Sequence, residues 1–383
     1  MIHKTLCKFG EFIPSSFLNS MSPLNTFYTA GPAALYPTFE THLRTALDEQ
    51  LGSISHRSSA FKKIYQHTDE QLRTLMGIPA ESAIMFTGSA SEVWERILLN
   101  LVELESFHLV NGSFSEKFYQ YAQALGKFPH ELRKPMGEGF AYNEPEIPDF
   151  VEVICVTQNE TSAGVQMREA DIHRLKRSHG KKLIAVDMVS SAPIPDLDMQ
   201  LIDTAFFSVQ KAFGLPAGLG VWIANEACLE KAQQMKQKEG ISIGAHHDLP
   251  TLWKQSKSYQ TPATPNVLLI YLLGKIAEDM NKIGIDVLRK EAHLKAKMIY
   301  NHLEDSALMN PAVANEEHRS VTVAVADTVI DSAILIDRMK QQKRIIGAGY
   351  GAKKERQIRI ASFPAVSVEQ VEELLDALKQ MEP

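Results

Sequence analysis

The sequence predicts an α/β fold, with a mostly parallel central sheet flanked by helices and a smaller α+β C-terminal domain. Short apolar, β-rich runs alternate with longer helical patterns through the first two thirds of the chain, which is typical of a sheet covered on both faces. After about residue 265 the pattern changes to long amphipathic helices with two short strands. A chain of 383 residues that is 44% hydrophobic can form two domains.

The individual elements follow from the apolar spacing. The expected strands of the first sheet are 82–87, 107–110, 151–157, 182–186, 205–209 and 220–224, and the expected helices between them include 61–76, 91–101, 115–125 and 168–177. The C-terminal part adds helices at 266–282, 285–303, 332–342 and 368–380 and strands at 319–326 and 357–361. We therefore expect an N-terminal arm over 1–34 that packs with the small domain, a large domain over 35–283 and a small domain over 284–383. Residues 1–20 have the character of an extension, because Met21 is a second plausible start.

Composition excludes several classes of function. The formal net charge is -6, and no basic face is implied, which argues against a nucleic-acid partner. The cysteines, Cys7, Cys155 and Cys228, are scattered without zinc spacing, and so few in this length fit a reducing cytoplasm. No apolar run approaches the roughly 20 residues of a membrane helix. The expectation is a cytoplasmic protein without a membrane partner.

Two charged residues that end apolar runs carry the chemistry. Lys211 follows the run 205–209 and has Phe207 and Phe213 as neighbours, while Asp187 ends the run 182–186. Ligands of such sheets bind beyond the strand ends. An amine in apolar surroundings has a lowered pKa, which suits a Schiff base with the aldehyde of pyridoxal phosphate, and a carboxylate can keep the pyridine nitrogen protonated. A solvated surface lysine is the alternative, and the aromatic neighbours argue against it.

Two further segments suit anions. Gly88, Ser89 and Ala90 lie between a strand and a helix, where free backbone N–H groups bind phosphate well. The alternative for this segment is a helix cap. His56 and Arg57 are adjacent between two helical stretches and offer cationic donors to an anionic group. The alternative there is an exposed polar loop.

Other candidates are less distinctive. Thr161 could reach a hydroxyl of a cofactor ring or lie in an ordinary turn, and Phe114 could cover a flat ring or pack in the core. Arg359 alternates with isoleucines, as expected of a carboxylate clamp or a salt-bridged edge residue, after a glycine-rich stretch that is expected to be mobile. The His-His-Asp run at 246–248 lacks ligand spacing, so a solvated or interface loop is favoured and no metal is expected.

Taken together, these segments resemble the class V, fold-type I pyridoxal-phosphate aminotransferases, and within them the phosphoserine branch. The resemblance covers roughly residues 25–380. The stretches that carry it are Tyr-Thr-Ala-Gly-Pro-Ala at 28–33, Ile-Ser-His-Arg-Ser at 54–58, Thr-Gly-Ser at 87–89, Gln-Asn-Glu-Thr at 158–161, Val-Asp at 186–187, Gln-Lys at 210–211 with Pro-Ala-Gly-Leu at 216–219, Thr-Pro-Ala-Thr at 261–264, and Ile-Arg at 358–359.

The resemblance implies roles for these residues. Lys211 would hold the cofactor and move a proton, and Asp187 would pair with the pyridine nitrogen. Arg359 would bind the substrate α-carboxylate, while His56 and Arg57 of the partner subunit would bind the substrate phosphate. The other implied cofactor contacts are Gly88, Ser89, Ala90, Phe114, Thr161 and Gln210 of one subunit, with Gln260 and Thr261 of the partner subunit, so a homodimer is implied.

The implied reaction is transamination between O-phospho-L-serine and 2-oxoglutarate in serine biosynthesis. The sequence departs from the branch in five places: Ser89-Ala90 replaces a more glycine-rich loop, Phe114 stands where Trp is usual, Gln260 stands where Asn is usual, Val189 stands where Ser is often found, and the stretch 347–354 lacks the usual His. Another class V activity, such as alanine- or serine-glyoxylate aminotransferase, is the alternative. A non-catalytic binding module is a third hypothesis, which the presence of Lys211 disfavours. A cysteine desulfurase needs a reactive Cys late in the chain, and none follows Cys228.

Overall fold

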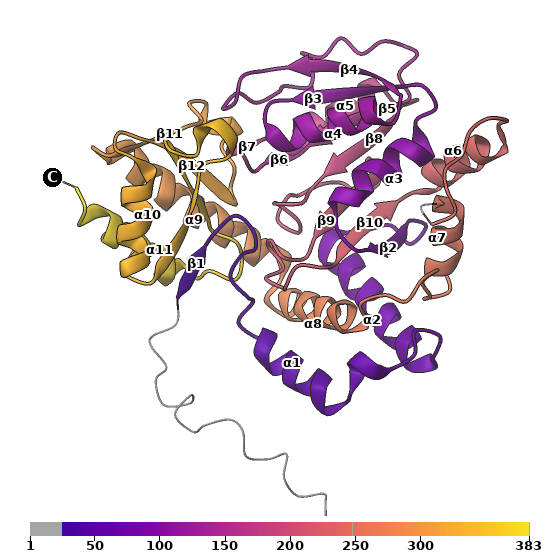
Figure 1. The fold of residues 1–383 in the computed structure, drawn as a ribbon, viewed down its shortest axis with the longest axis horizontal. Coiled ribbons are helices and arrows are strands. Elements are labelled where there is room, and N and C mark those ends of the chain that lie inside the picture. The colour runs from indigo at the N-terminus through magenta and orange to yellow at the C-terminus, as the bar shows by residue number, and fades with distance from the viewer. Residues whose placement is uncertain (1–24, 247, 383) are drawn as a thin grey trace, which may run out of the picture.

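The computed structural model describes residues 25–246 and 248–382, and it contains two main β-sheets that lie side by side (Figure 1). The larger sheet has seven strands in the order β2-β10-β9-β8-β5-β3-β4. β10 is antiparallel to both of its neighbours, and the other pairs are parallel, so the sheet is mostly parallel as expected. The strands are β2 (Ala83–Thr87), β3 (Glu105–Val110), β4 (Phe128–Arg133), β5 (Val153–Thr157), β8 (Leu183–Asp187), β9 (Thr204–Ser208) and β10 (Gly220–Ala224).

Helices cover both faces of this sheet because its strands are apolar on both sides. In β9, Phe207 belongs to one apolar core and the preceding Phe206 to the other, as the two-residue period of a strand requires. The first core includes residues of α2 (Ser59–Met76), α5 (Glu169–Ser178) and α8 (Val267–Ile283), with α1 (Phe39–Asp48) against α8. The second includes residues of α3 (Ser91–Leu101), α4 (Ser113–Ala124), α6 (Glu226–Gln237) and α7 (Leu249–Ser256).

The second sheet has five strands in the order β1-β13-β14-β12-β11. They are β1 (Thr26–Tyr28), β11 (Met309–Pro311), β12 (Val323–Thr328), β13 (Arg344–Ala348) and β14 (Gln357–Ala361). A third apolar core lies between this sheet and α9 (Ile285–Asp305), α10 (Ser332–Gln341) and α11 (Val368–Lys379). β1 pairs with β13, so the N-terminal end of the described chain lies in the second sheet.

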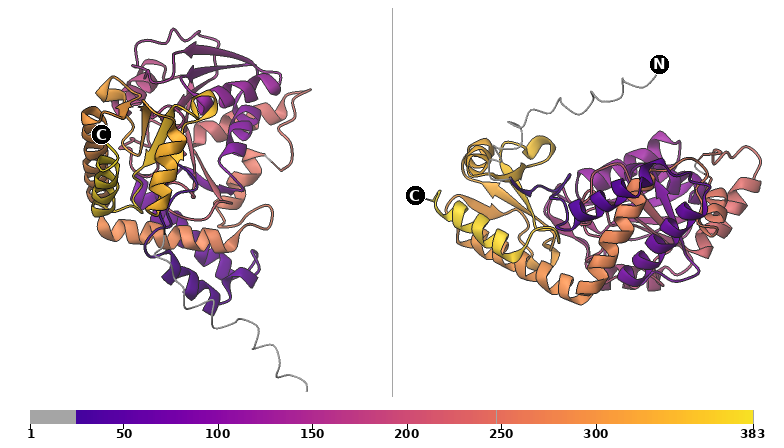
Figure 2. Two further views of the ribbon diagram at one scale, coloured as in Figure 1. Left: turned by 60° about the vertical axis from the view of Figure 1, so that its left-hand side comes forward. Right: turned by 90° about the horizontal axis from the view of Figure 1, so that it is seen from below.

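The chain passes from one sheet to the other between α8 and α9 (Figure 2). Gly284 separates the two helices with φ of 93°, a backbone conformation that favours glycine. Residues of α9 contribute to the first core at Leu288 and to the third at Ile299. The domain boundaries expected at 34 and 283 stay a prediction, and the expected extension over 1–20 lies outside the described residues.

The element predictions were good for the apolar segments. α3 and β14 have the expected bounds. The stretch expected to be mobile begins inside a strand instead, since Gly347 of β13 pairs with Arg359. The elements that had not been predicted are β1, α1, β4, a short hairpin of β6 (Asn159–Glu160) and β7 (Val165–Gln166), α6, α7, β11 and β13.

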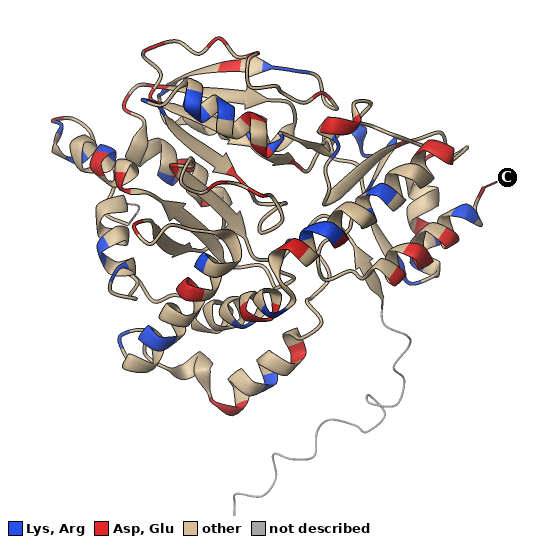
Figure 3. Ribbon diagram, turned by 180° about the vertical axis from the view of Figure 1, so that it is seen from behind, with Lys and Arg blue, Asp and Glu red and all other residues tan. Residues whose placement is uncertain are grey.

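Neither the surface charges nor the cysteine positions of the described residues indicate a further functional site. Positions of both signs are scattered over the outer helices (Figure 3). Cys155 and Cys228 are buried free thiols, and Cys7 lies outside the described residues. Within residues 25–246 and 248–382, no helix combines the length and the apolar character needed to cross a membrane.

Candidate active site

The carboxyl ends of four strands of the large sheet lie along one edge. Because β2 and β9 are both antiparallel to β10, they run in the same direction, and Thr87, Thr157, Asp187 and Ser208 end strands at this edge. A cavity of about 140 Å³ lies there. It is lined by Ala90, Ser91, Trp94, Phe114, Thr157, Asn159, Thr161, Asp187, Val189, Ser208, Gln210 and Lys211. The structure thus gathers seven of the residues singled out from the sequence around one space: Ala90, Phe114, Thr161, Asp187, Gln210, Lys211 and Val189.

Asp187 presents a buried carboxyl group to this cavity. The residue is 3% exposed. Its Oδ1 accepts a hydrogen bond from the backbone N–H of Val189, and its Oδ2 accepts one from Nε1 of Trp94, both at 2.9 Å. Burial raises the pKa of Asp187 to about 7, against the opposing effect of these donors. A carboxylate in this position is stabilised by a cationic N–H inside the cavity, which a protonated pyridine nitrogen provides.

Lys211 lies half-buried on the same cavity. Its Nζ donates a hydrogen bond to the carbonyl oxygen of Ala30 at 2.5 Å. Gly31 has φ of 142°, a conformation that favours glycine, and a Cβ atom on it would lie 2.2 Å from Nζ, so a larger residue would displace the end of the lysine side chain. Burial, helped by the charge of Arg359, lowers the pKa of Lys211 to about 8. An appreciable share of the amine is therefore neutral and nucleophilic near neutral pH.

A hydroxyl network lies beside these two groups. Thr161 donates from Oγ1 to Oγ of Ser190 at 2.6 Å, and Asn159 donates from Nδ2 to the same oxygen at 2.8 Å. The Ser190 carbonyl in turn accepts from Oγ1 of Thr322 on the approach to the second sheet. Asn159 lines the cavity, and its Oδ1 is buried and has no hydrogen-bond partner among the described residues. An unpaired buried acceptor is costly, so a donor from a bound ring hydroxyl would fit here.

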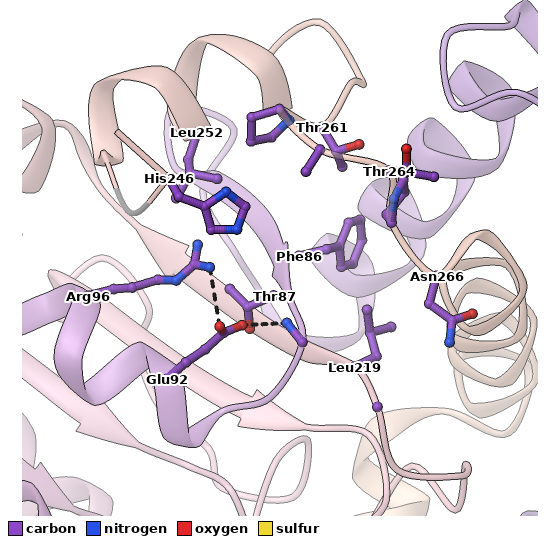
Figure 4. A pocket seen from close by; sticks show the side chains of 15 residues that line it. Phe86, Thr87, Glu92, Arg96, Leu219, His246, Leu252, Thr261, Thr264 and Asn266 are labelled. Atoms are coloured by element: carbon purple, nitrogen blue, oxygen red, sulfur yellow. Dashed lines mark hydrogen bonds and ion pairs between the residues drawn. The ribbon is translucent and has the colours of Figure 1, made fainter. Parts of the chain in front are cut away.

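The expected phosphate loop divides between two cavities. Ala90 lines the Lys211 cavity, and its N–H donates to Oγ of Ser208 at 3.0 Å. The N–H groups of Gly88 and Ser89 donate instead to Oε1 of Glu92. Gly88 lines a separate cavity of about 270 Å³ with Glu92, Arg96, His246 and Thr261 (Figure 4). The cofactor-phosphate roles of Gly88 and Ser89 therefore stay predictions, and any phosphate there competes with the Glu92 carboxylate.

Arg57, Gln260 and Thr261 form a second group. Nη1 of Arg57 donates to Oε1 of Gln260 at 3.2 Å and to the carbonyl of Thr261 at 3.0 Å. Neither these three residues nor His56 lines the Lys211 cavity. The structure therefore brings one part of the predicted site together around Lys211 and another part together around Arg57, without joining the two within one chain.

Arg359 lies on β14 near the cavity. Its Nε donates to the carbonyl of Ala348 at 2.8 Å, and its guanidinium carbon lies 5.5 Å from the centre of the Tyr350 ring. Within the described residues, the Nη1 and Nη2 groups have no hydrogen-bond partner, so they remain available to a carboxylate. Burial lowers the pKa of Arg359.

Three contacting residues had not been found from the sequence: Trp94, Ser190 and Tyr350. Trp94 lies on the apolar face of helix α3. In the sequence, a tryptophan that only packs in the core cannot be told from one that also donates a hydrogen bond. No group of three or more His, Cys, Asp and Glu positioned to hold a metal occurs in the part of the chain that the structure describes. His247 lies outside it, and Asp248 pairs with Lys236.

Comparison with known proteins shows the family to which the chain belongs. The profile of the family described as aminotransferase class-V matches residues 142–356, which is more than half of the chain. The chain belongs to the class V aminotransferase family. It is 27% identical over 372 residues to a phosphoserine aminotransferase of Corynebacterium glutamicum, with 96% of each chain covered.

Solved structures show the same fold. The crystal structure of a phosphoserine aminotransferase from Cytophaga hutchinsonii matches with a TM-score of 0.91 and 44% identity, over 93% of this chain and 98% of that one. A phosphoserine aminotransferase from Trichomonas vaginalis, solved with pyridoxal phosphate bound, matches with a TM-score of 0.76 and 20% identity, over 93% and 99%. The chain is thus a fold-type I, pyridoxal-phosphate-dependent aminotransferase.

Proposed function

We propose that this class V aminotransferase catalyses the reversible transamination between O-phospho-L-serine and 2-oxoglutarate, in the formation of serine. The observation that carries the proposal is the position of Arg57, held by Gln260 and the Thr261 carbonyl in a group separate from Lys211. A permanent cation held beside a predicted cofactor-phosphate segment suits a substrate with its own phosphate. The 44% identity to the Cytophaga hutchinsonii phosphoserine aminotransferase supports the same substrate.

Each residue of the cavity has a distinct task in this proposal. Pyridoxal phosphate, when bound, supplies an aldehyde for the substrate amine and a ring that withdraws electrons from the substrate Cα. Asp187 holds a proton on the ring nitrogen. Lys211 holds the cofactor and then moves a proton from the substrate Cα. Arg359 orients the substrate through its α-carboxylate, while Phe114 covers the ring and excludes water.

The site is complete only if a second copy of the chain contributes. Arg57, Gln260 and Thr261 lie outside the Lys211 cavity of their own chain, so in the proposal they serve the partner's cavity in a homodimer. Mixing Lys211→Ala with Arg57→Ala subunits tests this. Random reassociation of a symmetric dimer should restore roughly a quarter of the sites, whereas a site built within one chain would give no recovery.

A half-reaction screen tests the substrate. Holoenzyme is mixed in turn with phosphoserine, serine, alanine and glutamate, and the absorbance of the lysine-linked cofactor is followed, with Lys211→Ala as the control. The proposal expects fast conversion by phosphoserine and glutamate. Conversion by alanine or serine without phosphoserine would point to a glyoxylate-linked aminotransferase, and no conversion by any amino acid would point to a binding module.

A further inference from the structure

Tyr350 is contacted by Phe114 and Lys117 of helix α4 and by Arg359 of the second sheet. It therefore connects the two parts of the molecule near the Lys211 cavity. Tyr350 follows β13, and its hydroxyl accepts a hydrogen bond at 2.9 Å from Nζ of Lys117 on α4. The Tyr350 ring lies 5.2 Å from the ring of Phe114, at an angle of 44°. Phe114 itself lines the cavity. Lys117 and Tyr350 do not themselves line the cavity, and the Phe114 ring separates the Lys117 ammonium from it.

The charge of Lys117 is not balanced by a carboxylate. Its Nζ lies 5.4 Å from the centres of both the Phe114 and the Tyr350 rings, and it makes no ion pair within residues 25–246 and 248–382. Its neighbour Glu116 is paired with Arg133 instead. The nearby carboxylate of Glu160 is used by the N–H groups that start α4. A half-buried cation held by rings and one neutral hydroxyl can accept an anion at little cost.

Lys117 and Arg359 lie around the same ring. The guanidinium carbon of Arg359 is 5.5 Å from the centre of the Tyr350 ring, and the Lys117 ammonium is 5.4 Å from it. The Tyr350 ring thus lies between two cations. Each of them has N–H groups that make no hydrogen bond among the described residues. A substrate with two anionic groups can place its α-carboxylate on Arg359 and its second group on Lys117.

We propose that Lys117, positioned by the Tyr350 hydroxyl, binds the distal anionic group of the substrate and selects dianionic over monoanionic amino acids. The inference rests on the proposed function, because it presumes a phosphate or carboxylate at the far end of the substrate. A phosphate monoester carries a charge of about -1.5 to -2 at neutral pH. The permanent charge of Arg57 balances only part of it, and Lys117 balances the rest from the chain that holds Lys211.

Substrate discrimination by four variants tests this assignment. In half-reactions, Lys117→Met should raise the apparent Kd for phosphoserine and for glutamate at least about tenfold, as loss of a charge-assisted hydrogen bond does. The maximal rate and the Kd for alanine should stay unchanged. Lys117→Arg should restore most of the affinity, and Tyr350→Phe should give a smaller loss in the same direction. Lys340→Met, on an exposed face of α10, controls for the change in net charge.

Equilibrium binding gives a readout that does not depend on turnover. Calorimetry on the holoenzyme should show that Lys117→Met weakens glutarate, which has two carboxylates, and leaves butyrate, which has one, unaffected. Equal losses for both acids, or none, would overturn the role of Lys117. A wild-type enzyme that ignores phosphoserine but converts glutamate would defeat the proposed function alone, since the glutarate result would still support Lys117.

Discussion

The raised pKa of Asp187 predicts an unusual pH dependence of stability in the cofactor-free protein. The unfolded carboxyl group has a pKa near 3.8, and burial raises the folded value to about 7. Between these values the folded chain binds a proton that the unfolded chain has lost, so stability falls as the pH rises. The contribution of Asp187 is about 1.4 kcal/mol per pH unit, or about 4 kcal/mol over the whole window.

Asp187→Asn removes this contribution and keeps the shape of the side chain. The amide still accepts from one donor, so the variant carries a cost of about 1–3 kcal/mol for the other donor, and that cost does not depend on pH. Urea unfolding of both cofactor-free proteins between pH 4.5 and 7 would therefore be compared by slope rather than by absolute value. The slope of stability against pH is expected to be more positive in the variant, by up to about 1.4 kcal/mol per pH unit. The same slope in both proteins would refute the claim that Asp187 is protonated when the cavity holds no cationic partner.

Three further substitutions address the neighbours of the cavity. Gly31→Ala would place a Cβ atom 2.2 Å from Nζ of Lys211 and should weaken cofactor binding in an absorbance titration. Gly52→Ala is the control, because a Cβ atom there meets no atom within 4 Å, and it should leave cofactor binding unchanged. Equal losses of cofactor affinity in both variants would contradict the contact. Trp94→Phe removes the donor to the buried carboxylate and should weaken pyridoxal phosphate about tenfold, the effect of one hydrogen bond to a charged group, and an unchanged titration would argue against that bond. Arg359→Lys keeps the charge but loses the planar fork, so the apparent Kd of alanine and phosphoserine should rise alike, by about tenfold; a loss confined to phosphoserine would move Arg359 to the distal group.

Asp187 and Lys211 could be singled out from the sequence as candidates for the reacting groups because each stands at the end of an apolar run. Asp187 ends one apolar run that was predicted to be a strand, Lys211 follows another, and ligands of such sheets lie at strand ends. β4, which reads Phe-Pro-His-Glu-Leu-Arg, had not been predicted because it is an edge strand whose side chains are largely accessible. The antiparallel direction of β10 could not be predicted either, since its apolar pattern is that of any buried strand.

The contacts of the site depend on residues far apart in the chain. Trp94 and Asp187 are separated by 93 positions, and Lys117 and Tyr350 by 233. No local pattern encodes such pairs, because a tryptophan on a buried helix face packs in the core with or without a carboxylate partner. The pairing of Arg57 with Gln260 spans 203 positions and was likewise visible only in the fold.

Borohydride reduction of the holoenzyme, followed by mass spectrometry of its peptides, tests the central claim most directly. Reduction fixes pyridoxal phosphate on the lysine that holds it. A single modification per chain on Lys211, absent from Lys211→Ala, is the result that the geometry of the cavity predicts. A modification on any other lysine, or one that persists in Lys211→Ala, would contradict the assignment of the Lys211 cavity as the active site.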